Sequence, residues 1–427
     1  MTSPILDILE QRSLMQDCSN RAELAALFAS EPVTAYCGFD PTADSLHVGH
    51  LLPVVVLRWL QHCGHRPIVV LGSVTGMIGD PSGKSEERKL LDESLIAQYK
   101  RGLSAQLGKL LPSTANNPVQ VVENGEWLSK LSMVEYLRDV GKHVTVNAML
   151  AKDSVRTRLE NREQGISYTE FSYMLLQSYD FYHLYTAKGC RLQLGGSDQW
   201  GNITLGIDLI RRKSPEGSPP AYGLSIPLLL SSAGTKFGKT EAGAVWLDPQ
   251  RTSPYKFYQY FLNTRDDDVV RLLKVFTMLP LEQIAALEAN LVAKPEERGA
   301  QRALAREVTT WIHSATEAEK AERASSVLFG GDVTGLDRGT LLEIFGDVPS
   351  VDLPKSEALP NLVELLVKAG ATDSKGGAKR LIEGGGVYLN NIRATGAQQT
   401  VEEKDFLDGS LLILRSGKKN YFLVNRA

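Results

Sequence analysis

Apolar residues follow two different spacings along the chain, and the change from one spacing to the other predicts helices and strands in turn. The first 30 residues carry apolar side chains at helical spacing. The segment 33–40 is short, β-branched and aromatic, which favours a strand. Residues 46–62 are apolar nearly all round and predict a buried helix, whereas 65–76 predict a second buried strand ending in glycines. A strand, a helix and a strand in this order indicate a βαβ unit of a parallel sheet.

The alternation continues through the first half of the chain. We expect a strand over 118–124, a helix over 169–188, a strand over 190–200 that runs into a glycine-rich loop, and a helix over 203–213. A loop rich in proline, glycine and serine follows at 214–223. Beyond about residue 254 the apolar spacing becomes purely helical.

The end of the chain changes pattern again. A helix is expected over 361–370, where Gly370 stops it, and a shorter one over 373–386. Residues 387–391 predict a strand, and 411–425 predict two strands joined by a Gly-Lys-Lys turn.

These elements predict an α/β protein with a Rossmann-type parallel-sheet domain, followed by an all-helical domain and a small α+β tail domain. The expected boundaries are 1–254 for the first domain with its lysine loop at 234–240, 255–346 for the helical domain, 347–360 for a linker, and 361–427 for the tail.

Charge is nearly balanced, with 47 basic and 50 acidic residues among 427, and this excludes a polycationic, histone-like chain. The balance is uneven, because residues 355–427 carry 11 basic and 8 acidic residues. A basic tail on an acidic body suggests a polyanionic partner.

The four cysteines Cys18, Cys37, Cys63 and Cys190 are scattered and form no CxxC pair, so neither a zinc knuckle nor a disulfide framework is expected. The N-terminal segment has no basic start, and no apolar run approaches the roughly 20 residues of a membrane span. We therefore expect a cytoplasmic protein without a structural metal.

Two histidines, His47 and His50, stand at the start of the buried helix expected over 46–62, which Asp44 or Ser45 can cap. A helix N-terminus offers unpaired N–H groups and the positive end of the dipole, which suits phosphate. Gly49 between them allows close approach to the backbone. A second basic stretch, GDPSGKS at 79–85, resembles a P-loop, but its first glycine comes one residue too late for that motif.

Three further motifs carry polar side chains among glycines or apolar residues. They are GTKFGKT at 234–240, with two lysines three residues apart, LGGSDQWGN at 194–202, and FSYMLLQSYD at 171–180. In the last, Tyr173, Gln177 and Asp180 fall on one face of a helix. Taken singly, each motif also fits a solvated loop, a capped turn or a solvated helix face.

Together the motifs resemble the bacterial-type tyrosyl-tRNA synthetases, a family of class I aminoacyl-tRNA synthetases. HVGH at 47–50 and KFGKT at 236–240 are similar to the two signatures of the class. The segments YCGFDPTADSLH, TGMIGDPSGK, FSYMLLQSYD and GGSDQWGN are similar to the tyrosine branch, in the same order. One departure is NGEW at 124–127, where the family usually has Asn-Tyr-Asp-Trp, so no role is carried over to Gly125 or Glu126.

The resemblance implies a tyrosine–tRNA ligase, which activates L-tyrosine with ATP and Mg²⁺ and then charges tRNA(Tyr). It implies that Tyr36 and Asp180 bind the substrate phenol. The remaining tyrosine-binding residues would be Asp80, Tyr173, Gln177, Gln199 and Asn124. ATP would lie on Gly38, Asp40, Gly49, Asp198 and Lys239. The residues that act on the phosphates would be His47, His50, Thr42, Lys84, Arg88, Lys236, Lys239 and Thr240.

The resemblance also covers the rest of the chain. Residues 255–346 resemble the anticodon-side domain of the family, and the tail resembles a small RNA-binding module shared with a ribosomal protein. The implied tRNA contacts are Arg211, Arg212, Lys375, Lys379 and Arg380, and the implied assembly is a homodimer.

Three alternatives stay open at this stage. The tryptophan-specific relative shares fold and chemistry, and only the Tyr36–Asp180 pair favours a phenol over an indole. An RNA-binding protein on a decayed synthetase scaffold should have lost nucleotide-site residues, yet HVGH, GGSDQW and KFGKT are complete. A generic nucleotidyltransferase would not need the basic tail.

Overall fold

The computed structural model describes residues 5–82, 91–112, 117–160, 165–232, 234, 237–240, 243–327, 330–333, 335–346, 348–417 and 420–426. The chain divides into two compact units. Unit 1 comprises Met1–Arg251 and Arg265–Ala300, and unit 2 comprises Thr252–Thr264 and Gln301–Ala427. No helix among these residues is long and apolar enough to cross a membrane.

Unit 1 is built on a five-stranded parallel sheet with the order β3-β2-β1-β4-β5. The strands are β1 (Thr34–Phe39), β2 (Arg66–Leu71), β3 (Gln120–Glu123), β4 (Cys190–Gly196) and β5 (Tyr222–Ile226). The strand order reverses between β1 and β4. At such a switch point the connections on the two sides leave in opposite directions and open a crevice at the carboxyl ends of the strands.

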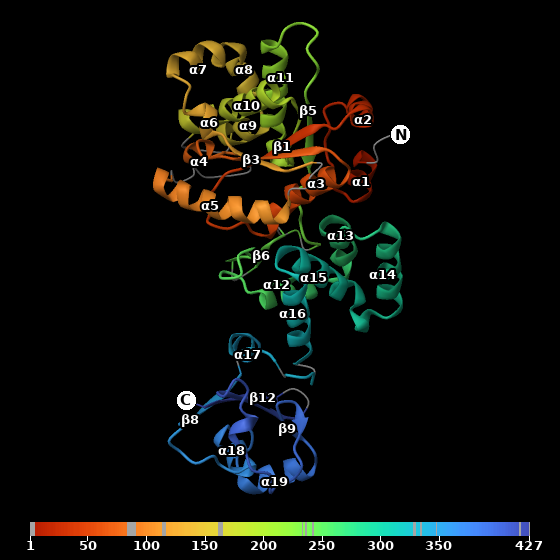
Figure 1. The fold of residues 1–427 in the computed structure, drawn as a ribbon, viewed down its shortest axis with the longest axis vertical. Coiled ribbons are helices and arrows are strands. Elements are labelled where there is room, and N and C mark those ends of the chain that lie inside the picture. Colours follow the sequence, from red (N-terminus) through yellow and green to blue (C-terminus); the bar gives the residue numbers. More distant parts are fainter. Residues whose placement is uncertain are drawn as a thin grey trace. The chain divides into compact units, whose positions relative to one another are not determined.

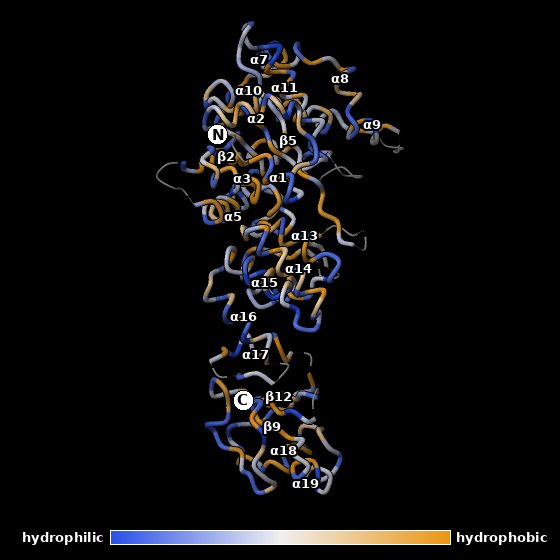
Figure 2. The backbone as a smooth tube through the Cα atoms, turned by 90° about the vertical axis from the view of Figure 1, so that its right-hand side faces the viewer, coloured by the Kyte–Doolittle hydropathy of each residue, from blue (hydrophilic) through white to orange (hydrophobic). Residues whose placement is uncertain are grey.

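Helices cover both faces of this sheet (Figure 1). The helix α3 (Leu51–His62) connects β1 to β2, and α11 (Trp200–Lys213) connects β4 to β5. Because such crossovers are right-handed and run in opposite directions, the two helices lie on opposite faces. The long helix α10 (Tyr168–Lys188) packs beside α11 on β4, and α5 (Glu93–Leu110) lies with α3. The orange stretches in Figure 2 follow the buried strands and α3.

The remaining helices of unit 1 are mostly short. They are α1 (Ile5–Gln11), α2 (Arg21–Ser30), α4 (Thr75–Ile78), α6 (Gly125–Leu128), α7 (Met133–Asp139), α8 (Val146–Leu150), α9 (Asp153–Glu160), α13 (Asp266–Phe276) and α14 (Leu281–Ala293). A two-stranded hairpin pairs β6 (Lys239–Thr240) with β7 (Gly243–Ala244). The sequence pattern left the helices α6 to α9 unassigned, because each is too short to show a period.

The helix expected over 46–62 begins differently from the prediction. A 3₁₀ turn, Val48–His50, precedes α3, and His47 caps it by accepting from the Gly49 N–H through Nδ1 at 3.1 Å. Asp44 or Ser45 was the expected cap. The Ser45 hydroxyl is used elsewhere, since it donates to the Leu46 carbonyl and accepts from the Asp248 N–H.

Unit 2 combines helices with a second sheet. The helices are α12 (Pro254–Leu262), α15 (Gly299–Ile312, which begins at the end of unit 1), α16 (Ala315–Val327), α17 (Arg338–Phe345), α18 (Leu362–Lys368) and α19 (Lys375–Glu383). The sheet order is β10-β9-β11-β12-β8, from β8 (Ser350–Leu353), β9 (Val387–Leu389), β10 (Ile392–Arg393), β11 (Leu411–Ser416) and β12 (Asn420–Arg426).

Two features differ from the expected domain division. The helical segment 255–346 is shared between the units, because α13 and α14 pack within unit 1. The segment 347–360, expected to be only a linker, contributes β8, which pairs in parallel with β12. A four-residue strand becomes stable only through a partner that lies far along the chain, so its own residues give little sign of it.

The strand β11, in the middle of the second sheet, has apolar residues at four successive positions, 411–414, and all four are buried. Leu412 and Leu414 face one core with α18 and α19, while Leu411 and Ile413 face another core with α16 and α17. Alternate residues of a strand point to opposite faces, so a strand covered on both sides needs apolar residues throughout.

Candidate active site

A cavity of about 370 Å³ lies at the switch point between β1 and β4, within unit 1. Its lining brings together most of the described residues that the sequence predicted for substrate and nucleotide. These are Tyr36, Gly38, Asp40, Thr42, Gly49, His50, Asp80, Asn124, Tyr173, Gln177, Asp180, Asp198 and Gln199. Motifs separated by more than 150 positions therefore converge on one space.

One end of the cavity is buried and carries Tyr36 and Asp180. The hydroxyl of Tyr36 is buried and has no hydrogen-bond partner among the residues that the structure describes. Burial raises the pKa of Tyr36 well above its ordinary value, and the neighbouring Asp180 raises it further, so its hydroxyl stays protonated. A buried hydroxyl without a partner is costly, and a polar ligand group would remove that cost.

Two side chains after β3 hold the Asp180 carboxylate. Trp127 Nε1–H donates to one carboxylate oxygen at 2.6 Å, and Asn124 Nδ2–H donates to the other at 3.0 Å. Burial raises the pKa of Asp180 to about 7, against these two donors, which lower it. Asn124 therefore lines the cavity and also contacts its buried end through Asp180. Trp127 was not predicted, although it stands in the NGEW segment at the carboxyl end of a strand, which is where α/β folds place functional groups.

The predicted face of α10 points into the cavity. Tyr173 and Asp180 are buried on this helix, and Gln177 is half-buried between them. The Tyr173 hydroxyl donates to Asp40 Oδ2 at 2.8 Å, and its pKa is raised well above the ordinary value by burial and by the Asp40 charge. Thr75 donates to the other Asp40 oxygen at 2.8 Å. Asp40 is thus fixed from both sides, and Thr75 is a second residue that the sequence did not indicate.

A second polar group joins Asp80, Gln199 and Asn202. Gln199 Nε2–H donates to Asp80 Oδ2 at 2.6 Å, and the Ser82 N–H donates to Asp80 Oδ1 at 3.0 Å. Asn202 Nδ2 lies 3.0 Å from Gln177 Oε1 and 3.3 Å from Gln199 Oε1. Oxygen atoms of Asp80, Gln177 and Gln199 thus gather at one wall of the cavity, and oxygen acceptors suit a cationic group.

The other end of the cavity is formed by residues 45–50, the histidine segment, which carries His47 and His50. The rings of His47 and His50 stack with centroids 3.9 Å apart, and His50 Nδ1 accepts from the His47 backbone N–H at 3.1 Å. Burial, with a smaller contribution from His47, lowers the pKa of His50 to about 3. A neutral imidazole whose Nδ1 accepts carries its proton on Nε2. His50 lines the cavity, whereas His47 lies beside it as the cap.

Gaps in the described chain fall on the basic loops. Lys84, Arg88 and Lys236 lie outside the described residues, and for Lys239 and Thr240 only the backbone, in β6, is described. Gly238 has φ +88° and lies against the histidine segment, because an added Cβ would come within 3.1 Å of the Gly49 nitrogen. The structure therefore brings the backbone of the lysine loop next to HVGH.

Glycines keep the middle of the cavity open. An added Cβ at Gly38 would meet nothing within 4 Å, whereas one at Gly72 would fall 1.9 Å from Asp40 Oδ1. Gly72 therefore makes room for the Asp40 carboxylate. Asp198 and Thr42 are exposed at the rim.

The predicted RNA-binding residues lie outside the cavity. On α11, Arg211 pairs with Asp208 at 3.2 Å and Arg212 donates to the His143 carbonyl at 2.9 Å. On α19, Lys375 pairs with Glu364 at 2.7 Å, and Lys379 and Arg380 are exposed.

Chemically, the cavity combines an amphipathic closed end, an acceptor-rich wall and a donor-bearing helix start. Such an arrangement can hold a zwitterion with a polar aromatic tip and, beside it, a polyphosphate.

Comparison with known proteins identifies the family to which the chain is similar. Residues 29–330 match the family described as tRNA synthetases class I (W and Y), and residues 340–424 match the tyrosine–tRNA ligase SYY-like C-terminal domain. The chain is 51% identical to the tyrosine–tRNA ligase of Opitutus terrae over 98% of this chain and 99% of the relative. It is 48% identical to that of Staphylococcus saprophyticus over the whole of both chains.

Solved structures agree with these matches. A C-terminally truncated mitochondrial tyrosyl-tRNA synthetase of Aspergillus nidulans superposes with a TM-score of 0.70 at 33% identity, covering 76% of this chain and 94% of that one. A tryptophanyl-tRNA synthetase of Encephalitozoon cuniculi bound to tryptophan reaches a TM-score of 0.55 at 13% identity, covering 74% of this chain and 91% of that one, and shares the fold.

Proposed function

The chain belongs to the class I tRNA synthetases of the tryptophan and tyrosine group, and within it to the tyrosine–tRNA ligases, and from that premise we propose which residues carry the reaction. The enzyme activates L-tyrosine with ATP to tyrosyl adenylate and pyrophosphate, and then transfers the tyrosyl group to the 3′-terminal adenosine of tRNA(Tyr).

One observation carries the assignment of the tyrosine pocket. The buried Tyr36 hydroxyl has no partner within the described part of the chain, and it lies beside Asp180 in the cavity wall. A substrate phenol can accept from Tyr36 and donate to the Asp180 carboxylate, which satisfies all three groups. Phenylalanine would leave the Tyr36 hydroxyl buried without a partner and would bring no donor to Asp180. This enzyme family is itself the established example of a site that rejects phenylalanine because buried polar groups are left without their substrate partner.

The acceptor-rich wall is proposed to hold the amino group of the substrate. Asp80 and Gln177 offer side-chain oxygens there, and the Tyr173 oxygen can accept while its proton goes to Asp40. Gln199 is proposed to lie near the substrate carboxylate, and Asn124 to act through Asp180.

The nucleotide is proposed to lie along the glycine-lined middle of the cavity. Gly38, Gly49, Asp40 and Asp198 would contact its adenosine portion. Thr42 and the two stacked histidines would meet the phosphates, and the lysines and arginine of the two basic loops, with Thr240, would grip the departing pyrophosphate.

The activation step needs no acid or base from the protein. A carboxylate oxygen of tyrosine attacks the α-phosphorus of ATP, the new O–P bond forms, and the bond to the β-phosphate oxygen breaks with release of pyrophosphate. Catalysis then comes from positioning and from donors aimed at the charge that develops on the phosphates. A neutral His50 with its proton on Nε2 is such a donor and costs no proton transfer.

Magnesium is proposed to arrive on the phosphates of ATP. Within the ranges that the structure describes, no group of three His, Cys, Asp or Glu side chains could hold a metal ion. A cytoplasmic location is also proposed, supported by the four cysteines, all of which are free thiols.

The homodimer is proposed on the basis of an apolar surface in unit 1. The helix α7 buries none of its residues, and some of these are apolar, since Met133 is 78% exposed and Val134 is 69% exposed. Leu137, Val146, Leu150 and Tyr168 nearby along the chain are exposed as well. A surface of this kind suits a second copy of the chain. Replacing Leu137 by Asp should give monomers in sedimentation equilibrium, and an unchanged mass would reject this surface as the interface.

For the tRNA, we propose that 255–346 forms the anticodon-side region, and that residues 361–427 bind RNA through Lys375, Lys379 and Arg380. Arg211 and Arg212 on α11 are proposed to hold the acceptor stem.

Exchange of radioactive pyrophosphate into ATP tests the pocket assignment. Exchange should depend on tyrosine, and a Tyr36→Phe, Asp180→Asn double variant should lose that dependence while it keeps its fold by circular dichroism. Undiminished exchange by the double variant would contradict the assignment.

A further inference from the structure

Residues 245–251, the segment that returns from the lysine-loop hairpin, run alongside the histidine segment. No residue of this returning segment has a role in the reaction proposed so far. The Val48 N–H donates to the Val245 carbonyl at 2.9 Å, and the Leu247 N–H donates to the Leu46 carbonyl at 2.8 Å. These two bonds form an antiparallel bridge between His47 and Trp246. Two segments about 200 positions apart are thereby fixed in one register.

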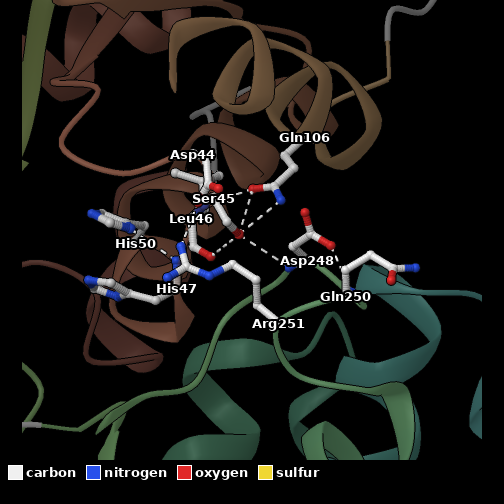
Figure 3. A network of polar contacts seen from close by, with 9 residues as sticks. All are labelled: Asp44, Ser45, Leu46, His47, His50, Gln106, Asp248, Gln250 and Arg251. Atoms are coloured by element: carbon white, nitrogen blue, oxygen red, sulfur yellow. Dashed lines mark hydrogen bonds and ion pairs between the residues drawn. The ribbon is translucent and has the colours of Figure 1, made fainter. Parts of the chain in front are cut away.

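A buried hydroxyl locks this register from one side. Ser45 is 1% exposed, and its Oγ accepts from the Asp248 N–H at 3.2 Å and from Gln106 Nε2 at 3.0 Å (Figure 3). Gln106, on α5, also accepts the Leu46 N–H through Oε1 at 2.8 Å. The start of the histidine segment is thus tied both to α5 and to the segment that returns from the lysine loop.

Arg251 closes the other side. Its guanidinium lies 3.5 Å from the centre of the Trp246 ring and pairs with Asp44 at 2.5 Å. The Trp246 ring in turn meets His47 edge-on, with centroids 5.9 Å apart. Figure 3 shows Arg251 reaching across from the returning segment to Asp44. An exposed ion pair alone contributes little, but here the same guanidinium also stacks on an aromatic ring.

The register set here extends into the lysine loop. The Val245 N–H donates to the Gly238 carbonyl at 3.1 Å, so the bridge continues into the KFGKT motif. In the hairpin, Lys239 pairs with Ala244. An added Cβ at Gly238 would lie 3.1 Å from the Gly49 nitrogen, a tight contact, and the φ of +88° at this position is one that other residues rarely adopt. A shift of the returning segment would therefore move the backbone of Lys239 relative to His50.

We propose that Asp44, Ser45, Gln106, Trp246 and Arg251 form a clasp that positions the lysine loop against the histidine segment for the activation step. None of the five needs to touch ATP, and each acts by fixing the distance between two groups of phosphate donors. The proposal rests on the role proposed above for Lys239. Because misplacement by about 1 Å can cost about a hundredfold in rate, a clasp of modest strength can have a large kinetic effect.

Three variants test the clasp in the full chain: Ser45→Ala, Gln106→Leu and Arg251→Met. The rate of tyrosyl-adenylate formation at saturating substrates, measured by stopped flow, should fall about tenfold or more. The tyrosine Kd should stay unchanged, because the Tyr36–Asp180 end lies outside the clasp. Arg251→Lys keeps the charge near Asp44 but not the flat stacking on Trp246, so it should recover only part of the rate.

Arg21→Met is the matched control. Arg21 pairs with Glu10 at 2.6 Å and, like Arg251, lies at the surface in an ion pair, but it joins α1 to α2. Its removal should leave the rate of adenylate formation unchanged. Thermal unfolding of every variant separates a kinetic effect from a general loss of stability.

Combination with Lys239→Ala distinguishes positioning from structural support. If the clasp acts through the lysine loop, clasp substitutions should lose most of their kinetic effect in the Lys239→Ala background. Equal fold-losses in both backgrounds, or clasp variants with an unchanged rate, would overturn the proposal. If Lys239→Ala itself leaves the rate unchanged, the proposed role of the lysine loop fails and the clasp proposal fails with it. A normal loss for Lys239→Ala beside unaffected clasp variants would reject the clasp alone.

Discussion

Asp180 is the residue whose chemistry depends most on its surroundings. Burial raises its pKa to about 7 from the ordinary 3.8. The folded protein then holds more protons than the unfolded chain between about pH 4 and pH 7, so the contribution of Asp180 to the free energy of unfolding falls as pH rises through this window. An ionised Asp180 is also the better acceptor for a phenol. Tyrosine affinity should therefore rise with pH up to about 7.

Trp127→Phe should shift this profile. The substitution removes a donor that favours the charged carboxylate, so the pKa of Asp180 rises and the midpoint of tyrosine binding moves to higher pH. Equilibrium dialysis of tyrosine between pH 5.5 and 9 measures it, and Asp180→Asn should give a flat profile. An unshifted midpoint in Trp127→Phe would show that the indole N–H does not stabilise the ionised form of Asp180.

Tyr36 should determine selectivity between tyrosine and phenylalanine. Tyr36→Phe removes one partner of the substrate phenol and leaves Asp180 in place. We expect kcat/KM for tyrosine to fall roughly 5–30-fold, which corresponds to a loss of about 1–2 kcal/mol of transition-state stabilisation. The value for phenylalanine should change little. Pyrophosphate exchange with each amino acid gives both values. An equal loss for the two amino acids would mean that the hydroxyl acts on the fold and not on the phenol.

Among the elements, the carboxyl end of α13 is stabilised by the buried guanidinium of Arg12. Arg12 is buried, donates to the carbonyls of Lys274, Thr277 and Leu279 at the end of α13, and lies 4.4 Å from the Trp59 ring. A cation at a helix C-terminus is favourable, and here it also satisfies three carbonyls.

Arg12→Met should lower the free energy of unfolding of unit 1 by about 3 kcal/mol, because it leaves buried carbonyls without a donor. Urea unfolding followed by tryptophan fluorescence measures the change. Arg21→Met, at an exposed pair, should cost at most about 1 kcal/mol. Similar small losses for both variants would show that Arg12 does not stabilise the end of α13.

Elements with their own period could be predicted from the sequence, and elements that depend on distant partners could not. The strand at 34–39 and the buried helix after it follow from their apolar residues. The strand β8 exists because β12 pairs with it. His47 caps the 3₁₀ turn, while the Ser45 hydroxyl accepts from the Asp248 N–H, about 200 positions away, a contact that has no sign in the local sequence.

The same distinction applies to the site. The face of α10 that carries Tyr173, Gln177 and Asp180 was predicted from helical spacing, and it lines the cavity. The donors Trp127 to Asp180 and Thr75 to Asp40 were missed, because a hydrogen bond between residues far apart along the chain has no spacing in the sequence.

At the scale of the whole molecule, the cavity lies within unit 1 and the basic helix α19 within unit 2. Activation and charging should therefore respond separately to substitution. A Lys379→Gln, Arg380→Gln double variant should keep its rate of pyrophosphate exchange, while kcat/KM for tRNA falls and its salt dependence weakens by about one unit of slope for each lost contact. Unchanged salt dependence would remove both residues from the RNA interface.

The proposed chemistry requires that one cavity places the substrate phenol between Tyr36 and Asp180 and the phosphates beside the histidine segment. A crystal structure with a non-hydrolysable tyrosyl-adenylate analogue tests it most directly. The phenol oxygen should lie within hydrogen-bond distance of Tyr36 Oη and of an Asp180 carboxylate oxygen, and the phosphate-like group should lie on the side of His50. A phenol that contacts neither side chain, or an analogue bound outside this cavity, would contradict it.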